Sequence, residues 1–150
     1  MREAIALSLR MMRRGAGGPF GALVVQGNRI VGRGWNQVTS VNDPTAHAEI
    51  VAIRAACRRL STFQLDACDL YTSCEPCPMC LSAIYWARIR RVFYGNTRRD
   101  AARIAFDDDF IYREAALPIR RRKLEMRQLL RKEALVAFVE WQKKPDKIQY

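Results

Sequence analysis

The sequence lacks the long apolar runs, the glycine- and proline-rich stretches and the paired cysteines that mark several large classes of protein. No apolar run approaches the roughly 20 residues that a helix needs to span a bilayer, and the first residues show no signal-peptide pattern. Gly and Pro number 8 and 6, and 49% of the residues are hydrophobic, which argues against a disordered or collagen-like chain. The 150 residues therefore predict one globular domain, 1–150, in the cytoplasm.

The cysteines do not form the pattern of a secreted disulfide framework. There are 5, an odd number, and Cys74, Cys77 and Cys80 fall within seven residues. A disulfide framework usually has an even number at wider spacing, whereas crowded thiols in an intracellular chain more often bind a metal. Cys57 and Cys68 are isolated, and we expect them to be small core residues.

Acidic residues are outnumbered, and the net charge of +11 suggests a nucleic-acid partner. The densest basic run, 120–123, has no interleaved aromatic residues on which bases could stack. A solvated surface explains the charge equally well, so nucleic acid is not excluded as a partner but is not favoured. A membrane is not predicted as a partner.

Apolar periodicity and turn residues divide the chain into helices and strands. Good helix formers fill residues 2–14 and stop at the Gly- and Pro-containing segment 15–19. Two short runs, 20–26 and 29–35, are joined by Gly27-Asn28 and predict a β-hairpin. The other predicted elements are a helix from Ala46 to Leu60 with Thr45 as N-cap, a strand at 70–72, a helix from Pro78 to about Arg88, a strand at 91–95, a short helix at 99–104 and a helix at 132–143. This alternation predicts an α/β sheet covered by helices.

Two short motifs predict a metal site. His47-Ala48-Glu49 contains the 1 histidine of the chain, and Pro76-Cys77-Pro78-Met79-Cys80 follows later. Both motifs lie where a helix is expected to begin, and the positive end of a helix favours thiolate over thiol. One imidazole and two thiolates suit zinc, and three protein ligands leave one position open for water, as in catalytic zinc sites. We therefore expect His47, Cys77 and Cys80 to bind one Zn²⁺.

Glu49 is the predicted catalytic residue, because it lies beside His47 without being needed as a ligand. It would take a proton from zinc-bound water and deliver protons to a ring nitrogen and to the departing amine. Zinc-bound hydroxide would attack an amidine-like ring carbon, so the expected reaction is hydrolytic deamination. A lone Cys-x-x-Cys can also be redox-active or half of a structural zinc site. Cys74 is the nearest fourth ligand for such a site, but we expect it to point elsewhere.

Longer segments around both motifs resemble a known family. They are 42–49 (NDPTAHAE), 70–80 (LYTSCEPCPMC) and 83–88 (AIYWAR), with 17–22 (GGPFGA) upstream and 106–112 (FDDDFIY) downstream. These residues are similar to the cytidine deaminase superfamily and, more narrowly, to the bacterial guanine deaminases. The metal motif is shared across the superfamily, whereas the Tyr-Trp-Ala-Arg and Phe-Asp-Asp segments and the terminal Tyr150 favour guanine.

The resemblance implies a fold, a reaction and an assembly. The fold would be a three-layer α/β/α sandwich of the cytidine-deaminase type, with a central mixed sheet of about five strands. The reaction would convert guanine, a small-molecule purine, and water to xanthine and ammonia. The protein would be a homodimer whose C-terminal segments, roughly 132–150, are exchanged between subunits.

The resemblance also implies substrate-binding residues. Asn36 would hydrogen-bond the purine through its amide, Phe20 would pack on the ring, and the backbone of Ala48 would contact it. Phe20 could instead be an ordinary core residue, and Asn36 could hold the loop after its strand.

Three further substrate contacts are implied nearer the C-terminus. Trp86 would line the pocket, Asp108 would accept hydrogen bonds from guanine N–H groups, and Tyr150 would reach the active site of the partner subunit. Trp86 could equally be core, Asp108 could cap a turn, and a terminal tyrosine could fray.

The sequence departs from the family at a few positions, and other functions stay open. Ser82 and Ala105 stand where the family commonly has glycine, and 118–131 matches poorly. The alternatives are a tRNA adenosine deaminase, a deaminase of guanosine or of an amino-triazine, and a zinc-stabilised binding module. The retained Glu49 argues against the binding module, which needs no proton shuttle.

Overall fold

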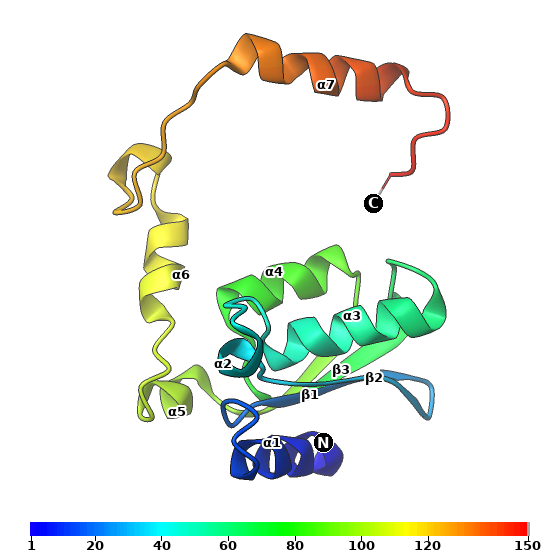
Figure 1. Ribbon diagram of the computed structural model, residues 1–150, viewed down its shortest axis with the longest axis vertical. Coiled ribbons are helices and arrows are strands. Elements are labelled where there is room, and N and C mark those ends of the chain that lie inside the picture. The colour runs from blue at the N-terminus through cyan, green and yellow to red at the C-terminus, as the bar shows by residue number, and fades with distance from the viewer. Residues whose placement is uncertain (150) are drawn as a thin grey trace. The chain divides into compact units, whose positions relative to one another are not determined.

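The computed structural model describes residues 1–149, which divide into two compact units, one from Met1 to Asp109 and the other from Phe110 onward (Figure 1). The first unit contains α1 (Arg2–Arg13), β1 (Gly21–Gln26), β2 (Arg29–Trp35), α2 (Val38–Val41), α3 (Ala48–Leu60), β3 (Cys68–Cys74), α4 (Pro78–Trp86), β4 (Arg91–Asn96) and α5 (Arg98–Ala102). Helix α6 (Asp109–Ala116) begins at the boundary, and the 3-10 helix η1 (Ile119–Arg121) and α7 (Arg131–Lys143) follow. The predicted helices and strands are confirmed, while α2 and α6 were not expected from the sequence.

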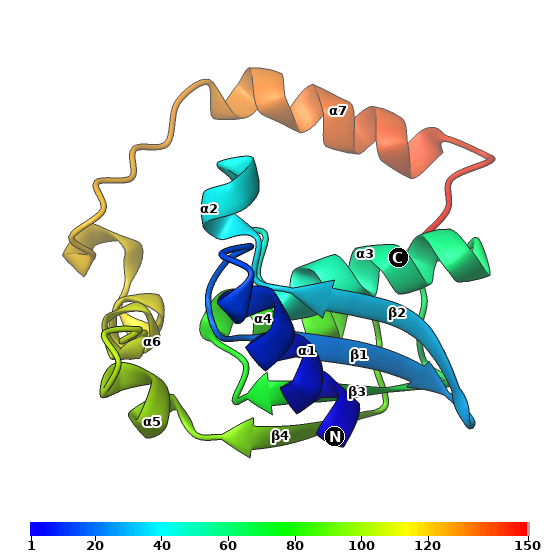
Figure 2. The same cartoon turned by 60° about the horizontal axis from the view of Figure 1, so that its bottom comes forward.

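The strands form one mixed sheet in the order β2-β1-β3-β4 (Figure 2). Strand β1 pairs antiparallel with both β2 and β3, and β3 pairs parallel with β4. The β1–β2 hairpin turns at Gly27, whose φ of 57° suits a glycine. The parallel pair requires a crossover, which α4 provides. The described residues thus form a sheet of 4 strands, against the expected number of about five.

Helices cover both faces of this sheet, and the first unit is the expected three-layer α/β/α sandwich. Helix α1 lies on one face, and α3 and α4 lie on the other (Figure 1). Ala22 and Val24 of β1 belong to the core shared with α3 and α4, whereas Leu23 packs in the smaller core beneath α1. This division follows from the two-residue period of a strand, which sends neighbouring side chains to opposite faces.

The first turn of α3 is held very close to β2. A Cβ at Gly34 of β2 would lie 2.1 Å from the carbonyl oxygen of Ala48, so a side chain at this position is excluded. Ala48 is fully buried and begins α3 directly after His47. Gly34 therefore allows the close approach of α3 to β2, and this approach sets how far from the sheet His47 and Glu49 lie.

The predicted N-cap of α3 is wrong. The N-cap residue is His47, not Thr45. The backbone N–H and the hydroxyl of Thr45 both donate to Asp43 Oδ1, at 2.8 and 2.7 Å. Asp43 thus closes an Asx turn before the helix. His47 occupies the N-cap position, but its side chain makes no capping hydrogen bond.

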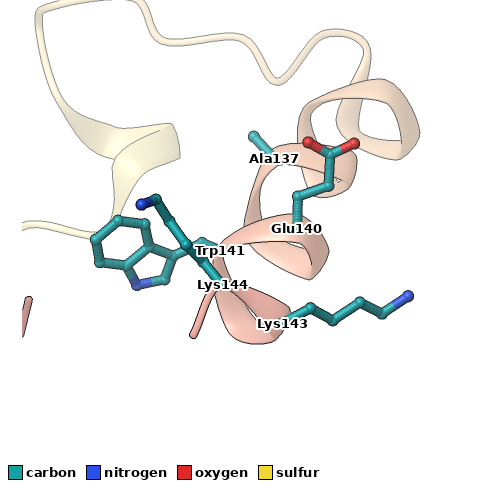
Figure 3. Close-up of a pocket in the computed structure, with 5 residues that line it drawn as sticks. All are labelled: Ala137, Glu140, Trp141, Lys143 and Lys144. Atoms are coloured by element: carbon teal, nitrogen blue, oxygen red, sulfur yellow. The ribbon is translucent and has the colours of Figure 1, made fainter. Parts of the chain in front are cut away.

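The second unit has no buried side chain in the described part of its helices. Its exposed large apolar residues are Phe110, Ile111, Ile119, Leu124, Met126, Leu129, Leu130, Val136, Phe138, Val139, Trp141 and Ile148. A pocket in this unit is lined by residues of α7 and its C-cap (Ala137, Glu140, Trp141, Lys143 and Lys144; Figure 3), none of which is a predicted site residue. Among the described residues, no helix combines the length and apolar character that crossing a membrane requires.

Candidate metal centre and active site

His47, Cys77 and Cys80 come together at one point of the first unit. Their ligand atoms all lie within 4.8 Å of one another. His47 Nδ1 is 3.5 Å from the sulfur of Cys77 and 3.5 Å from the sulfur of Cys80. One nitrogen and two sulfurs are a donor set that fits zinc. The two motifs, far apart in the sequence, thus come together in a single cluster whose donor atoms suit zinc.

The starts of two helices position these three side chains. His47 is the N-cap of α3, Cys77 is the N-cap of α4, and Pro78 occupies the first turn of α4, where its fixed φ is compatible with a helix. Cys80 lies one helical turn after Cys77, so both sulfurs lie on the same side. The partial positive charge of a helix N-terminus favours thiolates at this point.

The two thiols are electrostatically unequal. The neighbouring Cys80 thiol and then His47 lower the pKa of Cys77 to about 4, while Cys77 and burial raise the pKa of Cys80. The hydrogen-bonded Cys77 raises the pKa of His47. The cluster therefore holds one thiolate readily, and a metal that binds both sulfurs displaces the second thiol proton.

Cys74 is not part of the cluster. Its sulfur lies 3.7 Å from the carbonyl oxygen of Thr97, at the far end of β4, and burial raises the pKa of Cys74 to about 11. The Cys74 thiol thus has a hydrogen-bond partner outside the metal cluster, and its sulfur is not among the clustered ligand atoms. In the described part of the chain the metal group therefore has three members, the number found in catalytic zinc sites.

Glu49 lies beside the metal cluster and is almost completely buried, with 6% of its surface exposed. Its Oε2 accepts a hydrogen bond from the Cys80 thiol at 3.4 Å, and its Oε1 accepts one from the Thr72 hydroxyl at 3.4 Å. Burial is the largest cause that raises the pKa of Glu49. A buried carboxyl with a raised pKa next to a metal cluster is suited to accept and release a proton.

Asn36 is 7% exposed and lies directly after β2. Its Oδ1 accepts hydrogen bonds from the backbone N–H groups of Gly18 (3.4 Å) and Val38 (3.3 Å). Its Nδ2 donates to no group in the described residues. The side chain therefore holds the loop through its oxygen and still has an amide donor available.

Phe20 lies next to Asn36, because the Phe20 carbonyl accepts the Asn36 N–H at 3.1 Å. The Phe20 ring meets the ring of Phe106 edge to face, with centroids 4.9 Å apart and planes at 86°. Phe20 is half-buried and packs against the main core, whereas Phe106 is 47% exposed, so the pair lies where the core reaches the surface. Ala48 lies between His47 and Glu49 in the sequence, and it is fully buried in the main core.

The remaining predicted site residues have different surroundings. Asp108 is half-buried; its pKa is raised by burial and, next, by the charge of Cys77, which places its carboxyl within electrostatic range of the cluster. The turn beside it is capped by Asp107, whose Oδ1 accepts the N–H of Asp109 at 3.0 Å. Trp86 ends α4 with 66% of its surface exposed. Tyr150 lies outside the described residues.

The sequence interpretation missed two residues that the structure brings to the site. Thr72 contacts Glu49, and Phe106 contacts Phe20. The signal for Thr72 was strand periodicity, since it lies two residues after the core residue Leu70 and so faces α3. Polar residues on the core-facing side of a strand indicate a buried polar partner.

Comparison with known proteins agrees with this geometry. Residues 1–96 match the cytidine and deoxycytidylate deaminase zinc-binding region. The chain is 49% identical over 150 residues to the guanine deaminase of Bacillus subtilis (strain 168), covering 100% of this chain and 96% of that protein. The X-ray structure of guanine deaminase from Bacillus subtilis is similar with a TM-score of 0.96 and 49% identity, over 99% of this chain and 95% of that chain.

A second group of relatives matches over a shorter stretch. A tRNA-specific adenosine deaminase of Agrobacterium fabrum is 49% identical over 77 residues, which is 51% of this chain and 51% of that protein. The identity to these two proteins is therefore the same, and they differ in the share of this chain that they cover, 100% against 51%.

Proposed function

This chain belongs to the cytidine and deoxycytidylate deaminase family of zinc-binding enzymes, and we propose that it catalyses the hydrolytic deamination of guanine to xanthine and ammonia. The observation that supports deamination is the buried Glu49 carboxyl, 3.4 Å from a sulfur of the His47–Cys77–Cys80 cluster. The choice of guanine is supported by the similarity to a guanine deaminase over the full 150 residues, against 77 residues for the tRNA deaminase.

His47, Cys77 and Cys80 hold the zinc ion in this proposal. When bound, zinc lowers the pKa of a coordinated water toward about 7, so that a nucleophile exists at neutral pH. Glu49 would accept one proton of the attacking water and deliver it to the ring nitrogen next to C2 as the C2–O bond forms. It would then move the second proton of that water from the new hydroxyl at C2 to the amine, so that the C2–N bond breaks and ammonia leaves.

Asn36, Phe20 and Ala48 are proposed to bind the purine. The Asn36 oxygen is already engaged by Gly18 and Val38, so the amide N–H₂ is the group that remains for a purine acceptor. The half-buried Phe20, paired with the exposed Phe106, offers an aromatic surface for the flat ring. The backbone of Ala48 adds a contact between the ring and the first turn of α3.

Asp108 and Trp86 are proposed to complete specificity. Asp108 is a carboxyl within electrostatic range of Cys77, and as a carboxylate it accepts the N–H groups that guanine presents. Adenine has fewer such N–H groups, so this contact favours guanine. Trp86, which is 66% exposed, would line the pocket.

We further propose that residues 1–150 form one catalytic domain that works as a homodimer with exchanged C-terminal segments, roughly 132–150, in which Tyr150 reaches the partner's active site. The second unit supports this, because its described helices bury no side chain of their own while presenting many large apolar residues. The 5 free cysteines suit the reducing conditions of the cytoplasm, where we propose that the enzyme acts.

A substrate panel tests the proposed reaction. Purified enzyme with one zinc per chain is incubated with guanine, guanosine, an amino-triazine and a tRNA anticodon stem-loop that contains adenosine. We expect ammonia and xanthine from guanine at the highest kcat/KM. Inosine formation in the RNA without xanthine formation from guanine would overturn the assignment, and so would faster ammonia release from guanosine or the triazine.

A further inference from the structure

Two side-chain groups of the described residues donate to the Glu49 carboxyl, the Thr72 hydroxyl at Oε1 and the Cys80 thiol at Oε2. Cys80 can donate only as a thiol, yet zinc binds the thiolate. Of these two groups, the one that still donates to Glu49 when Cys80 serves as a ligand is therefore Thr72.

We propose that Thr72 is the positioning residue that holds the Glu49 carboxyl in the orientation needed for proton transfer. The inference rests on the proposed function, because it assigns a role to a residue that acts through Glu49. Thr72 itself touches neither substrate nor zinc in this proposal.

The place of Thr72 in the sheet makes it a rigid support. It belongs to β3, a central strand, and pairs with Ala22 of β1 on one side and Tyr94 of β4 on the other. Its side chain is 1% exposed and β-branched, so χ1 has little freedom. Glu49, by contrast, has a long side chain with several rotatable bonds, and the bond to Thr72 restricts it.

The chemistry of a hydroxyl matches a carboxyl that gains and loses a proton. A hydroxyl donates to a carboxylate and accepts from a carboxylic acid. The Thr72 hydroxyl can therefore hydrogen-bond the Glu49 side chain in either direction, whereas an alkyl side chain would make no such bond.

Variants of Thr72 separate the hydroxyl from the bulk of the side chain. Thr72→Val keeps the shape and removes the hydroxyl, while Thr72→Ser and Thr72→Ala both remove the methyl group and only Ser keeps the hydroxyl. Each variant is purified with zinc, and its kcat and KM for guanine, zinc content and melting temperature are measured. Ser73→Ala is the matched control, because it removes a buried hydroxyl from the same strand without touching Glu49.

The proposal predicts that Thr72→Val and Thr72→Ala lose kcat on the order of tenfold to a hundredfold, because a misplaced catalytic group costs about this much. KM and zinc content should stay within about twofold of wild type, and Thr72→Ser should recover most of kcat. If Thr72→Val does not fold, Thr72→Ser and Thr72→Ala still compare a side chain that has the hydroxyl with one that lacks it.

Three results would overturn the positioning role. Equal kcat for Thr72→Ser and Thr72→Ala would show that the hydroxyl is unimportant. Equal loss of kcat in Ser73→Ala would show a general effect of weakening β3, and loss of zinc would show a structural effect on the metal site. Failure of the proposed function is separate, because wild-type enzyme would then form no xanthine.

Discussion

The backbone carbonyl of Asn36 occupies the space that a side chain at Gly17 would need. A Cβ at Gly17 would lie 1.8 Å from this oxygen, and the φ of Gly17 is +141°. The next residue, Gly18, donates its N–H to Asn36 Oδ1. The glycine pair therefore lets the segment before β1 approach Asn36 closely, and it sets the position of the proposed purine ligand.

Gly17→Ala is expected to destabilise the protein and to weaken substrate binding. The clash with the Asn36 carbonyl and the unfavourable φ together should cost about 3 kcal/mol or more of unfolding free energy. KM for guanine should rise, because the displaced backbone carries Asn36. Gly15→Ala is the control: φ is +68° and nothing lies within 4 Å of the new Cβ. It should cost about 1 kcal/mol and leave KM unchanged.

Asn36→Asp should separate the two roles of this side chain. Aspartate keeps an oxygen for the N–H groups of Gly18 and Val38, but it loses the amide donor. We expect a melting temperature near that of wild type and a fall in kcat/KM for guanine of about tenfold to a hundredfold. Asn36→Ala removes both groups and should lower stability as well. Wild-type kcat/KM in Asn36→Asp would mean that the residue holds only the loop.

Glu49→Gln should abolish proton transfer without disturbing the metal site. Glutamine has nearly the same shape but cannot take up a proton, so ammonia release should fall by about 10² to 10⁴. Zinc content should match wild type, since Glu49 is outside the ligand group. Glu3→Gln, an exposed carboxylate on α1, is the control and should retain full activity. Ammonia release by Glu49→Gln close to the wild-type rate would refute the role of Glu49.

Much of the first unit could be predicted because its signals are local. The Gly27-Asn28 turn defines the hairpin, and Pro78 marks the start of α4. The zinc ligands could be predicted because their helix starts and spacing are local as well. Neither His47 nor the Cys77–Cys80 pair supplies enough ligands for a metal alone, so the two motifs are expected to meet at one site.

The features that could not be predicted depend on contacts between residues far apart in the sequence, or on which of two nearby residues makes a hydrogen bond. Thr45 and Asp43 are both good capping residues. The sequence alone does not show that the Thr45 hydroxyl donates to Asp43 and therefore does not cap α3. The Thr72–Glu49 contact joins residues 23 apart. Helix α6 has no buried residue, so no core-facing stripe fixes its place in the chain.

Asp69→Asn should lower stability in a pH-dependent way. Arg91 donates two hydrogen bonds to Asp69 from the neighbouring strand β4, at 3.0 and 2.8 Å, and it holds the pKa of Asp69 below its usual value of 3.8. A lowered folded-state pKa means that this stabilisation is present above pH 3.8 and disappears as the pH falls through the folded-state value.

The melting temperature of Asp69→Asn should therefore lie below that of wild type at pH 7, and the gap should close in acid. Asp66→Asn is the control, because Asp66 bonds the backbone N–H of Ala67 and, in the described residues, no arginine. A gap that persists unchanged below pH 3 would show that the cause is not the charge of Asp69.

A mixed dimer tests whether Tyr150 acts on the partner subunit. Deleting Tyr150 should lower kcat/KM for guanine without loss of zinc, because the residue is proposed to contact substrate and no ligand. Glu49→Gln should be inactive for a different reason, although it still supplies an intact C-terminus. In a heterodimer of these two variants, the subunit that retains Glu49 would receive Tyr150 from its Glu49→Gln partner.

Heterodimers purified through two different tags should then show about half of the wild-type activity, since one of two equivalent sites is complete. If Tyr150 instead acts on the active site of its own subunit, each site of the heterodimer would lack either Glu49 or Tyr150. The heterodimer would then be no more active than the average of its parents. Light scattering on the same samples verifies that a dimer is present, and a monomer with full activity would rule out exchange altogether.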